Sequence, residues 1–255
     1  MLYQSPKGSI GTTIENRIAT VEFAHPTSNC FPADLLRGFT EEINSLSENP
    51  QVLVIIIRSS GTGVFCAGAS FDELLAVSNL EEATRFFSGF ANVINAMRSC
   101  SKIIIGRIQG KAVGGGVGII SACDYVFATM DSSIKLSELS IGIGPFVIEP
   151  AVSRKIGKSA MAELTLASSD WKDSEWAKSK GLYTKVFAGQ VTLDIELAQF
   201  SSKLASYNIE ALLEIKKTLW EGTENWDTLL YDRAAISGKL VLSDFTKNAL
   251  RQLKK

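Results

Sequence analysis

Apolar and polar residues alternate in the first part of the chain and then give way to continuous apolar runs. Residues 9–24 alternate around the polar pair at 15–16, which predicts a β-hairpin. The runs VLVIIIRSS (52–60) and KIIIGRIQG (102–110) are rich in β-branched residues. Continuous runs of this kind predict strands that are buried on both faces of a sheet. A shorter run, DYVFAT (124–129), predicts a third strand.

Elsewhere the apolar residues recur at helical spacing. The segment ADLLRGFTEEINSLSE (33–48) follows Pro32, a residue that favours the first turn of a helix. A second helical pattern runs from about Glu73 to Met97. The pattern is again mostly helical from Ala151 to about Ser168 and from about Leu193 to the end. The order strand, glycine-containing loop, helix occurs twice, which predicts an α/β fold with crossover connections and a helical C-terminal third.

Composition narrows the class of protein. The chain has 255 residues, enough for one substantial core, with 45% hydrophobic and 21% charged residues. A formal net charge of −1 gives no support to binding of nucleic acid or of a membrane surface. No apolar run is long enough to cross a bilayer, and the first residues lack a signal pattern. We therefore expect a soluble protein in the cytoplasm.

Cysteine and histidine usage restricts the chemistry. The four cysteines are widely spaced and form no CxxC pair, which favours a reducing compartment. His25 is the only histidine, which argues against a His-dependent hydrolase and against most zinc sites. We expect no metal site.

Two glycine-containing loops, FCAGA (65–69) and VGGGVG (113–118), each follow a predicted buried strand. They are not nucleotide motifs. The GKS at 157–159 lacks the earlier glycine of a phosphate-binding loop, and VGGGVG lacks the GxGxxG spacing. Loops at the carboxyl ends of parallel strands face the ligand crevice, so one N–H from each loop could converge on a single oxygen. The alternative is that the glycines only let a helix pack closely on the sheet.

The segments FCAGASFDEL and GKAVGGGVGIISACDYVFA, together with HPTSN and SELSIGIGP (137–145), resemble the crotonase or enoyl-CoA hydratase/isomerase superfamily. The resemblance implies a spiral of ββα units over residues 1–190, which hold an acyl-CoA site. It also implies a helical oligomerisation region over residues 191–255, in a homotrimer or a hexamer built from two trimers. The substrate implied is an acyl-CoA thioester, and no cofactor is expected beyond the CoA of the substrate.

The same resemblance assigns roles to individual residues. It implies that the backbone N–H groups of Ala69 and Gly115 form an oxyanion hole for the thioester carbonyl. The expected substrate contacts are Ala67, Gly68, Ala69, Ser70, Phe71, Gly114, Gly115 and Gly118. Basic residues of the C-terminal helices often contact CoA phosphates in this superfamily, which makes Lys216, Lys254 and Lys255 candidates. A solvated helix face explains these lysines equally well.

The acidic residues depart from the family pattern. Hydratases of the family carry one glutamate two residues after GGG and another in a PE dipeptide. Here the first position is Gly118, while the second is Glu138 in Ser137-Glu138. Hydration uses two carboxylates, whereas migration of a double bond from the 3- to the 2-position needs one base. The pattern therefore favours an isomerase in which Glu138 moves the proton.

Glu149 keeps a second hypothesis open. It follows Gly144-Pro145 in the first turn of a predicted helix, a vicinity from which some family members take a catalytic acid. If Glu149 faces the site, two carboxylates are available and enoyl-CoA hydratase becomes the alternative. An acid at this position also complements a helix dipole at the surface. A third possibility, of a different class, is an acyl-CoA-binding or scaffold subunit without turnover.

Overall fold

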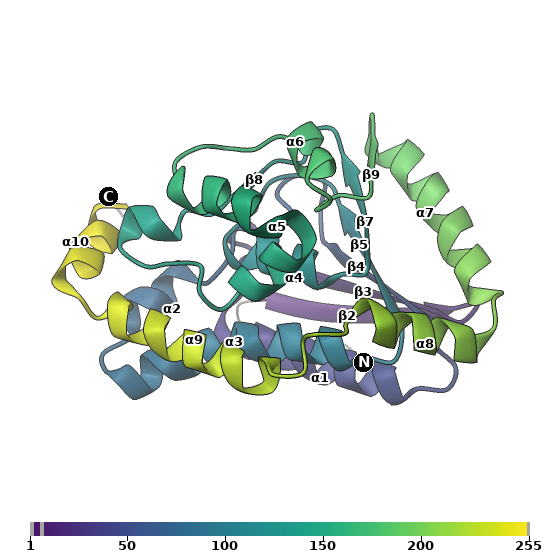
Figure 1. The fold of residues 1–255 in the computed structure, drawn as a ribbon, viewed down its shortest axis with the longest axis horizontal. Helices are drawn as coiled ribbons and strands as arrows, with labels where there is room; N and C mark the ends of the chain where they lie inside the picture. The colour runs from purple at the N-terminus through teal and green to yellow at the C-terminus, as the bar shows by residue number, and fades with distance from the viewer. Residues whose placement is uncertain (1–2, 6–7, 254–255) are drawn as a thin grey trace.

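The computed structural model describes residues 3–5 and 8–253, and its centre is a seven-stranded sheet (Figure 1). The strand order is β1-β2-β3-β4-β5-β7-β9. The first three strands pair antiparallel and the remaining pairs are parallel. The bounds are β1 Tyr3–Ser5, β2 Gly8–Glu15, β3 Ile18–Ala24, β4 Val54–Ser59, β5 Ile103–Ile108, β7 Tyr125–Thr129 and β9 Lys185–Phe187. A separate two-stranded parallel ribbon consists of β6 Ala112–Val113 and β8 Ile134–Lys135.

Helices connect the strands and make up the C-terminal part of the chain (Figure 1). They are α1 Ala33–Glu48, α2 Phe71–Ala76, α3 Leu80–Ser99, α4 Gly115–Ala122, the 3-10 helix η1 Glu138–Ile141, α5 Glu149–Leu166, α6 Ser174–Ser179, α7 Gln190–Ala205, α8 Ile209–Leu219, α9 Trp226–Val241 and α10 Asp244–Leu253. None of the helices in the described ranges has the length and apolar character needed to cross a membrane.

Alternate residues of the central strands face two different apolar layers. Ile55 and Ile57 of β4 belong to the large cluster that α1, α3 and α4 form on one face of the sheet. Val54 and Ile56 belong to a second cluster, together with residues of α7 and α8 on the other face. Every residue of β5 is buried. The prediction of strands buried on both faces is therefore confirmed, and the hairpin is confirmed by the pairing of β2 with β3.

The helix predicted from Glu73 to Met97 was wrong as a single element, because two helices occupy this region. Helix α2 ends at Ala76, and Asn79 starts α3 by accepting a hydrogen bond from the Glu82 N–H at 2.9 Å. An asparagine cap of this kind satisfies a backbone donor that would otherwise lack a partner. The apolar spacing continues through the break and does not reveal it.

Candidate active site

The structure brings the two glycine loops together through backbone hydrogen bonds. The Val113 N–H donates to the Cys66 carbonyl at 2.9 Å, and Cys66 forms an isolated parallel bridge with Ala112. Gly68 has φ +86°, and a Cβ there would lie 2.8 Å from the Val113 carbonyl oxygen and 3.6 Å from the Gly115 nitrogen. Only glycine accommodates both the backbone angle and this close approach.

The three consecutive glycines each have a physical reason. Gly114 has φ +52°, and a Cβ there would lie 2.8 Å from Oε1 of Glu138. A Cβ on Gly115 would lie 2.1 Å from the ring of Phe90, and one on Gly116 would lie 2.8 Å from the Cβ of Cys66. A side chain at any of the three would displace a neighbour, and at Gly114 that neighbour is the carboxylate of Glu138.

Two backbone N–H groups remain unused beside these glycines. Gly115 is the first residue of α4, and the first N–H groups of a helix have no partner within it. Ala69 forms an isolated bridge with Phe31, in which the hydrogen bonds use the Phe31 and Ser70 N–H groups. Neither the Ala69 nor the Gly115 N–H donates a hydrogen bond to another described residue. Both residues line the same cavity.

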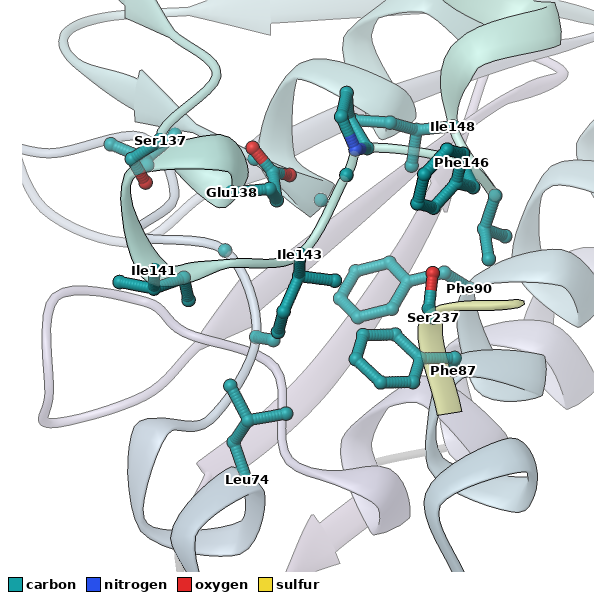
Figure 2. A pocket seen from close by; sticks show the side chains of 18 of the residues that line it. Leu74, Phe87, Phe90, Ser137, Glu138, Ile141, Ile143, Phe146, Ile148 and Ser237 are labelled. Carbon is teal, nitrogen blue, oxygen red and sulfur yellow. The ribbon is translucent and has the colours of Figure 1, made fainter. Parts of the chain in front are cut away.

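This cavity has a volume of about 110 Å³ and is mostly apolar (Figure 2). It lies between the two glycine loops, η1 and the segment that leads into α5, while α2, α3 and α9 contribute further side chains. Figure 2 shows the rings of Phe87 and Phe90 beside the hydroxyl of Ser237. The polar side chains of the lining are those of Ser137, Glu138 and Ser237.

Glu138 begins η1 and holds its carboxylate against the cavity. The residue as a whole is partly exposed, but its Oε2 atom is buried and has no hydrogen-bond partner among the described residues. Burial raises the pKa of Glu138 to about 7, against a small opposing effect of a hydrogen bond from its own backbone N–H. A carboxyl with one unpartnered oxygen and a pKa of about 7 is suited to accept and return a proton.

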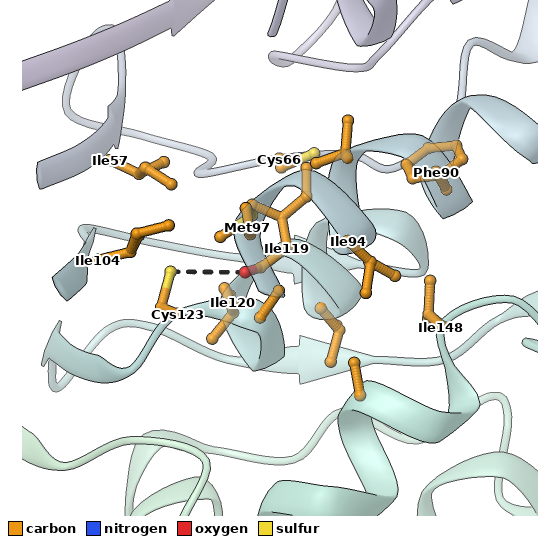
Figure 3. Close-up of a cluster of buried hydrophobic side chains, with 14 of the residues drawn as sticks. Ile57, Cys66, Phe90, Ile94, Met97, Ile104, Ile119, Ile120, Cys123 and Ile148 are labelled. Atoms are coloured by element: carbon orange, nitrogen blue, oxygen red, sulfur yellow. Dashed lines mark hydrogen bonds between the residues drawn. The ribbon is translucent and has the colours of Figure 1, made fainter. Parts of the chain in front are cut away.

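Gly118 does not line the cavity, although it was expected among the substrate contacts. A Cβ at this position would lie 2.4 Å from Cγ2 of Ile148. Ile148 is 4% exposed and belongs to the same apolar cluster as Ile94 and Phe90 (Figure 3). The space that a side chain at position 118 would need is therefore filled by Ile148.

Glu149 also lies outside the cavity lining. Its carboxylate accepts hydrogen bonds from the Ser153 hydroxyl at 2.6 Å and from the Lys158 ammonium, and Arg233 lies 3.9 Å away. Partial burial acts to raise the pKa of Glu149, but the hydrogen bonds from Lys158 and Ser153 and the charges of Lys158 and Arg233 outweigh it and lower the pKa. Glu149 is thus an ion-paired carboxylate at the start of α5.

The other expected substrate contacts also fall into two groups, those that line the cavity and those that do not. Ala67, Gly68, Phe71 and Gly114 line the cavity together with Ala69 and Gly115. Ser70 does not line it. Ser70 is the N-cap of α2, where its hydroxyl accepts a hydrogen bond from the Glu73 N–H at 3.4 Å.

Lys216 fits neither of its two interpretations, a contact with a CoA phosphate or a place on a solvated helix face. Its side chain is 3% exposed, and its ammonium donates to Asp124 at 2.7 Å and to the Met97 carbonyl at 3.1 Å. A lysine held in this way is not available to a phosphate in solvent. Lys254 and Lys255 lie outside the described residues.

Sequence reasoning missed the residues that enclose the cavity. Phe87 and Phe90 come from α3, and Ser237 comes from α9, far along the chain. Helix spacing could have shown that Phe87 and Phe90 share a face of α3. Nothing in the sequence around Ser237 signals that α9 packs on α3 and presents this hydroxyl to the cavity.

The model of the enoyl-CoA hydratase/isomerase family matches residues 13–246. The chain belongs to this family. Family membership covers the whole site, because both glycine loops and η1 fall inside the matched residues. It establishes the superfamily fold.

Several curated members of the family are similar in sequence. A peroxisomal Delta(3,5)-Delta(2,4)-dienoyl-CoA isomerase from Arabidopsis thaliana is 30% identical over 65% of this chain and 63% of that protein. A mitochondrial methylglutaconyl-CoA hydratase from Mus musculus is 33% identical over 62% of this chain and 50% of that protein. The matched region thus spans half to under two thirds of these relatives. A short-chain-enoyl-CoA hydratase from Clostridium acetobutylicum is 25% identical over 92% of this chain and 90% of that protein.

Solved structures of the family share the fold. An enoyl-CoA hydratase from Bacillus halodurans has a TM-score of 0.88 at 20% identity and covers 95% of this chain and 99% of that one. An enoyl-CoA hydratase from Mycobacterium avium has a TM-score of 0.85 at 23% identity, with 96% and 95% covered. At these identities the likeness concerns the fold alone.

Proposed function

We propose that this family member binds an enoyl-CoA thioester and moves its double bond from the 3- to the 2-position. Glu138 is the acid–base group, and the N–H groups of Ala69 and Gly115 are the oxyanion hole. The observation that carries the proposal is that Glu138 is the one ionisable side chain of the cavity lining, which lies entirely within the described residues. Neither Gly118 nor Glu149 supplies a second carboxylate to it.

The proposed reaction needs a single group that moves one proton. The ionised Glu138 removes a proton from Cα of the 3-enoyl thioester, and the electron pair of that C–H bond passes into a dienolate. The negative charge develops on the thioester oxygen, where two hydrogen bonds from backbone N–H groups stabilise it. The protonated Glu138 then delivers the proton to Cγ, which leaves the double bond between Cα and Cβ.

Two properties of the site support this assignment. The pKa of Glu138 lies at about 7, so both of its protonation states are accessible near neutrality. Gly115 also begins α4, where the positive end of the helix dipole reinforces its N–H as a donor to an oxyanion.

The test is to follow 3-hexenoyl-CoA and 2-hexenoyl-CoA separately with the purified protein and with the Glu138→Gln variant. The proposal expects conversion of the 3-enoyl substrate without a change of mass, and its loss in the variant. If the protein binds both thioesters and converts neither, a binding subunit without turnover is the better description.

Hydration is the second candidate function, because the short-chain-enoyl-CoA hydratase relative matches over 92% of this chain. A hydratase would add one water, about 18 mass units, to 2-hexenoyl-CoA. Loss of that reaction in both Glu138→Gln and Glu149→Gln would make Glu149 the second acid and would overturn the isomerase proposal.

We also infer that the C-terminal helices form subunit contacts in a homotrimer or hexamer. Large apolar side chains are exposed on α7 and α8, at 76% for Val191, 54% for Ile195 and 51% for Ile215. Exposed apolar side chains gathered on neighbouring elements are typical of interaction surfaces. Light scattering of the protein and of an Ile215→Glu variant tests this, and a monomeric unmodified protein would contradict it.

A further inference from the structure

Among the described residues, the cavity beside Glu138 is lined by no group that could neutralise a negative charge on the acyl part of a substrate. None of the residues that line it is Lys, Arg or His. Beyond Glu138 the lining consists mainly of the side chains Leu74, Phe87, Phe90, Ile143, Phe146 and Ile148. An acyl group in this space is therefore surrounded by hydrocarbon.

The cation of α9 that shares a helix face with Ser237 is held elsewhere. Arg233 lies one helical turn before Ser237, but it does not line the cavity, and its guanidinium lies 3.9 Å from Glu149. Lys158 also binds the Glu149 carboxylate. Both positive charges are therefore paired with Glu149, and neither residue lines the cavity.

Ser237 is the polar side chain that α9 contributes to the lining. The residue is 1% exposed, and its hydroxyl lies beside the rings of Phe87 and Phe90 (Figure 2). A hydroxyl can donate one hydrogen bond to a buried carboxylate but cannot neutralise it. Removing an ionised carboxylate from water without a counter-charge costs several kcal/mol, and Glu138 would add repulsion when it is ionised.

We propose that the cavity selects an uncharged acyl group and rejects one that ends in a carboxylate, and that Ser237 is the position at which this preference is set. The inference rests on the proposed function, because it assumes that the acyl group enters the cavity beside Glu138. It also separates this chain from the methylglutaconyl-CoA hydratases among its relatives, whose substrate name denotes an acyl group with a second carboxyl.

The experiment compares two saturated thioesters of the same shape, glutaryl-CoA and 5-methylhexanoyl-CoA. The first ends in a carboxylate, and the second ends in an isopropyl group in its place. Neither reacts, so calorimetric Kd values report selection without any turnover, and the charges of CoA cancel in the ratio. We expect 5-methylhexanoyl-CoA to bind at least about 100-fold more tightly. Equal affinity, including no binding of either thioester, overturns the inference.

A matched pair of variants locates the preference. Ser237→Lys places an ammonium in the cavity and is expected to shift the Kd ratio at least about 10-fold toward glutaryl-CoA. Ile236→Lys makes the same charge change on the adjacent residue, which is 42% exposed and outside the cavity lining, and should leave the ratio unchanged. An equal shift of the Kd ratio in both variants would show that the preference is not set at position 237. If Ser237→Lys does not fold, the wild-type ratio still decides whether charge is rejected.

The two proposals can fail separately. A strong preference for 5-methylhexanoyl-CoA in a protein that does not convert 3-hexenoyl-CoA would refute the isomerase and leave the selection intact. Conversion of 3-hexenoyl-CoA with equal Kd values would refute the selection and leave the isomerase intact.

Discussion

Two buried carboxylates in this protein have opposite surroundings. The side chain of Asp124 is 2% exposed and accepts hydrogen bonds from the Ile104 N–H at 2.8 Å, the Lys216 ammonium at 2.7 Å and the Trp220 indole at 2.7 Å. Glu138 has an Oε2 atom with no partner among the described residues, and burial raises its pKa to about 7. Asp124 therefore joins α8 to the sheet, whereas Glu138 lies at the cavity.

The difference shows two roles that a buried carboxylate can have. A carboxylate with a full set of donors and a counter-ion is a structural link whose loss leaves other groups without partners. A carboxylate with few partners and no counter-ion lowers stability when it is ionised, and such groups are typical of functional sites. Changing each acid, or its surroundings, should therefore affect different properties of the protein.

The largest expected effect is on the reaction. Glu138→Gln keeps the size of the side chain and removes its proton affinity, so kcat for isomerisation should fall by about 10²–10⁴. The melting temperature should not fall, because glutamine carries no charge that must be buried. Steady-state kinetics and thermal unfolding of the same preparation check both parts. A folded variant with unchanged kcat would remove Glu138 from the mechanism.

The next effect is on stability. Lys216→Met removes the counter-ion of Asp124 and leaves its charge buried, which should lower the free energy of unfolding by about 3–5 kcal/mol. Lys217→Met is the matched control, because Lys217 is 60% exposed and pairs with Glu214 at the surface. It should change the free energy by less than about 0.5 kcal/mol. Urea unfolding of both variants measures the difference, and similar values would contradict the structural role of the buried pair.

Glu138 should also make stability depend on pH in an unusual direction. Its pKa rises from 4.5 to about 7 on folding, so between these values the native protein holds a proton that the unfolded chain has released. Its stabilising contribution is fully present below pH 4.5 and is lost as the pH rises through about 7, by on the order of 3 kcal/mol in total.

The measurement is the difference in unfolding free energy between the wild type and Glu138→Gln from pH 4.5 to pH 8. Groups common to both proteins cancel in that difference. The rate should change in the opposite sense, because the proposed base acts when ionised, and kcat/KM should rise with pH through about 7. A flat stability difference would indicate that Glu138 titrates normally.

The smallest expected effect concerns Gly118, the position that holds a glutamate in the family pattern. Gly118→Ala should lower the free energy of unfolding by about 1–3 kcal/mol, because its Cβ would lie 2.4 Å from Cγ2 of Ile148. Gly63→Ala is the control, since a Cβ there meets nothing within 4 Å. Chemical denaturation of the two variants checks the prediction. Equal stability would mean that Ile148 moves easily and that position 118 can hold a side chain.

The sequence predicted the parts of the fold in which neighbouring residues carry the signal. The β-branched runs identified β4 and β5, and alternation identified the hairpin of β2 and β3, because strand and helix periods are local properties. The resemblance of the glycine loops to the enoyl-CoA hydratase/isomerase family identified that family. The break between α2 and α3 was missed, because a single capping residue, Asn79, interrupts an otherwise continuous helical pattern.

Only the tertiary structure decided which charged groups form pairs. Lys216 and Asp124 are 92 residues apart, and nothing near either one shows that they form a buried pair. Glu138 and Glu149 lie in one short stretch of sequence, yet Glu138 lines the cavity with an unpartnered Oε2 atom while Glu149 is held by Ser153 and Lys158. The sequence by itself determined the family, the candidate acids and five of the strands, namely β2, β3, β4, β5 and β7. Packing decided which acid lines the cavity, because burial and partners depend on residues that are distant in the chain.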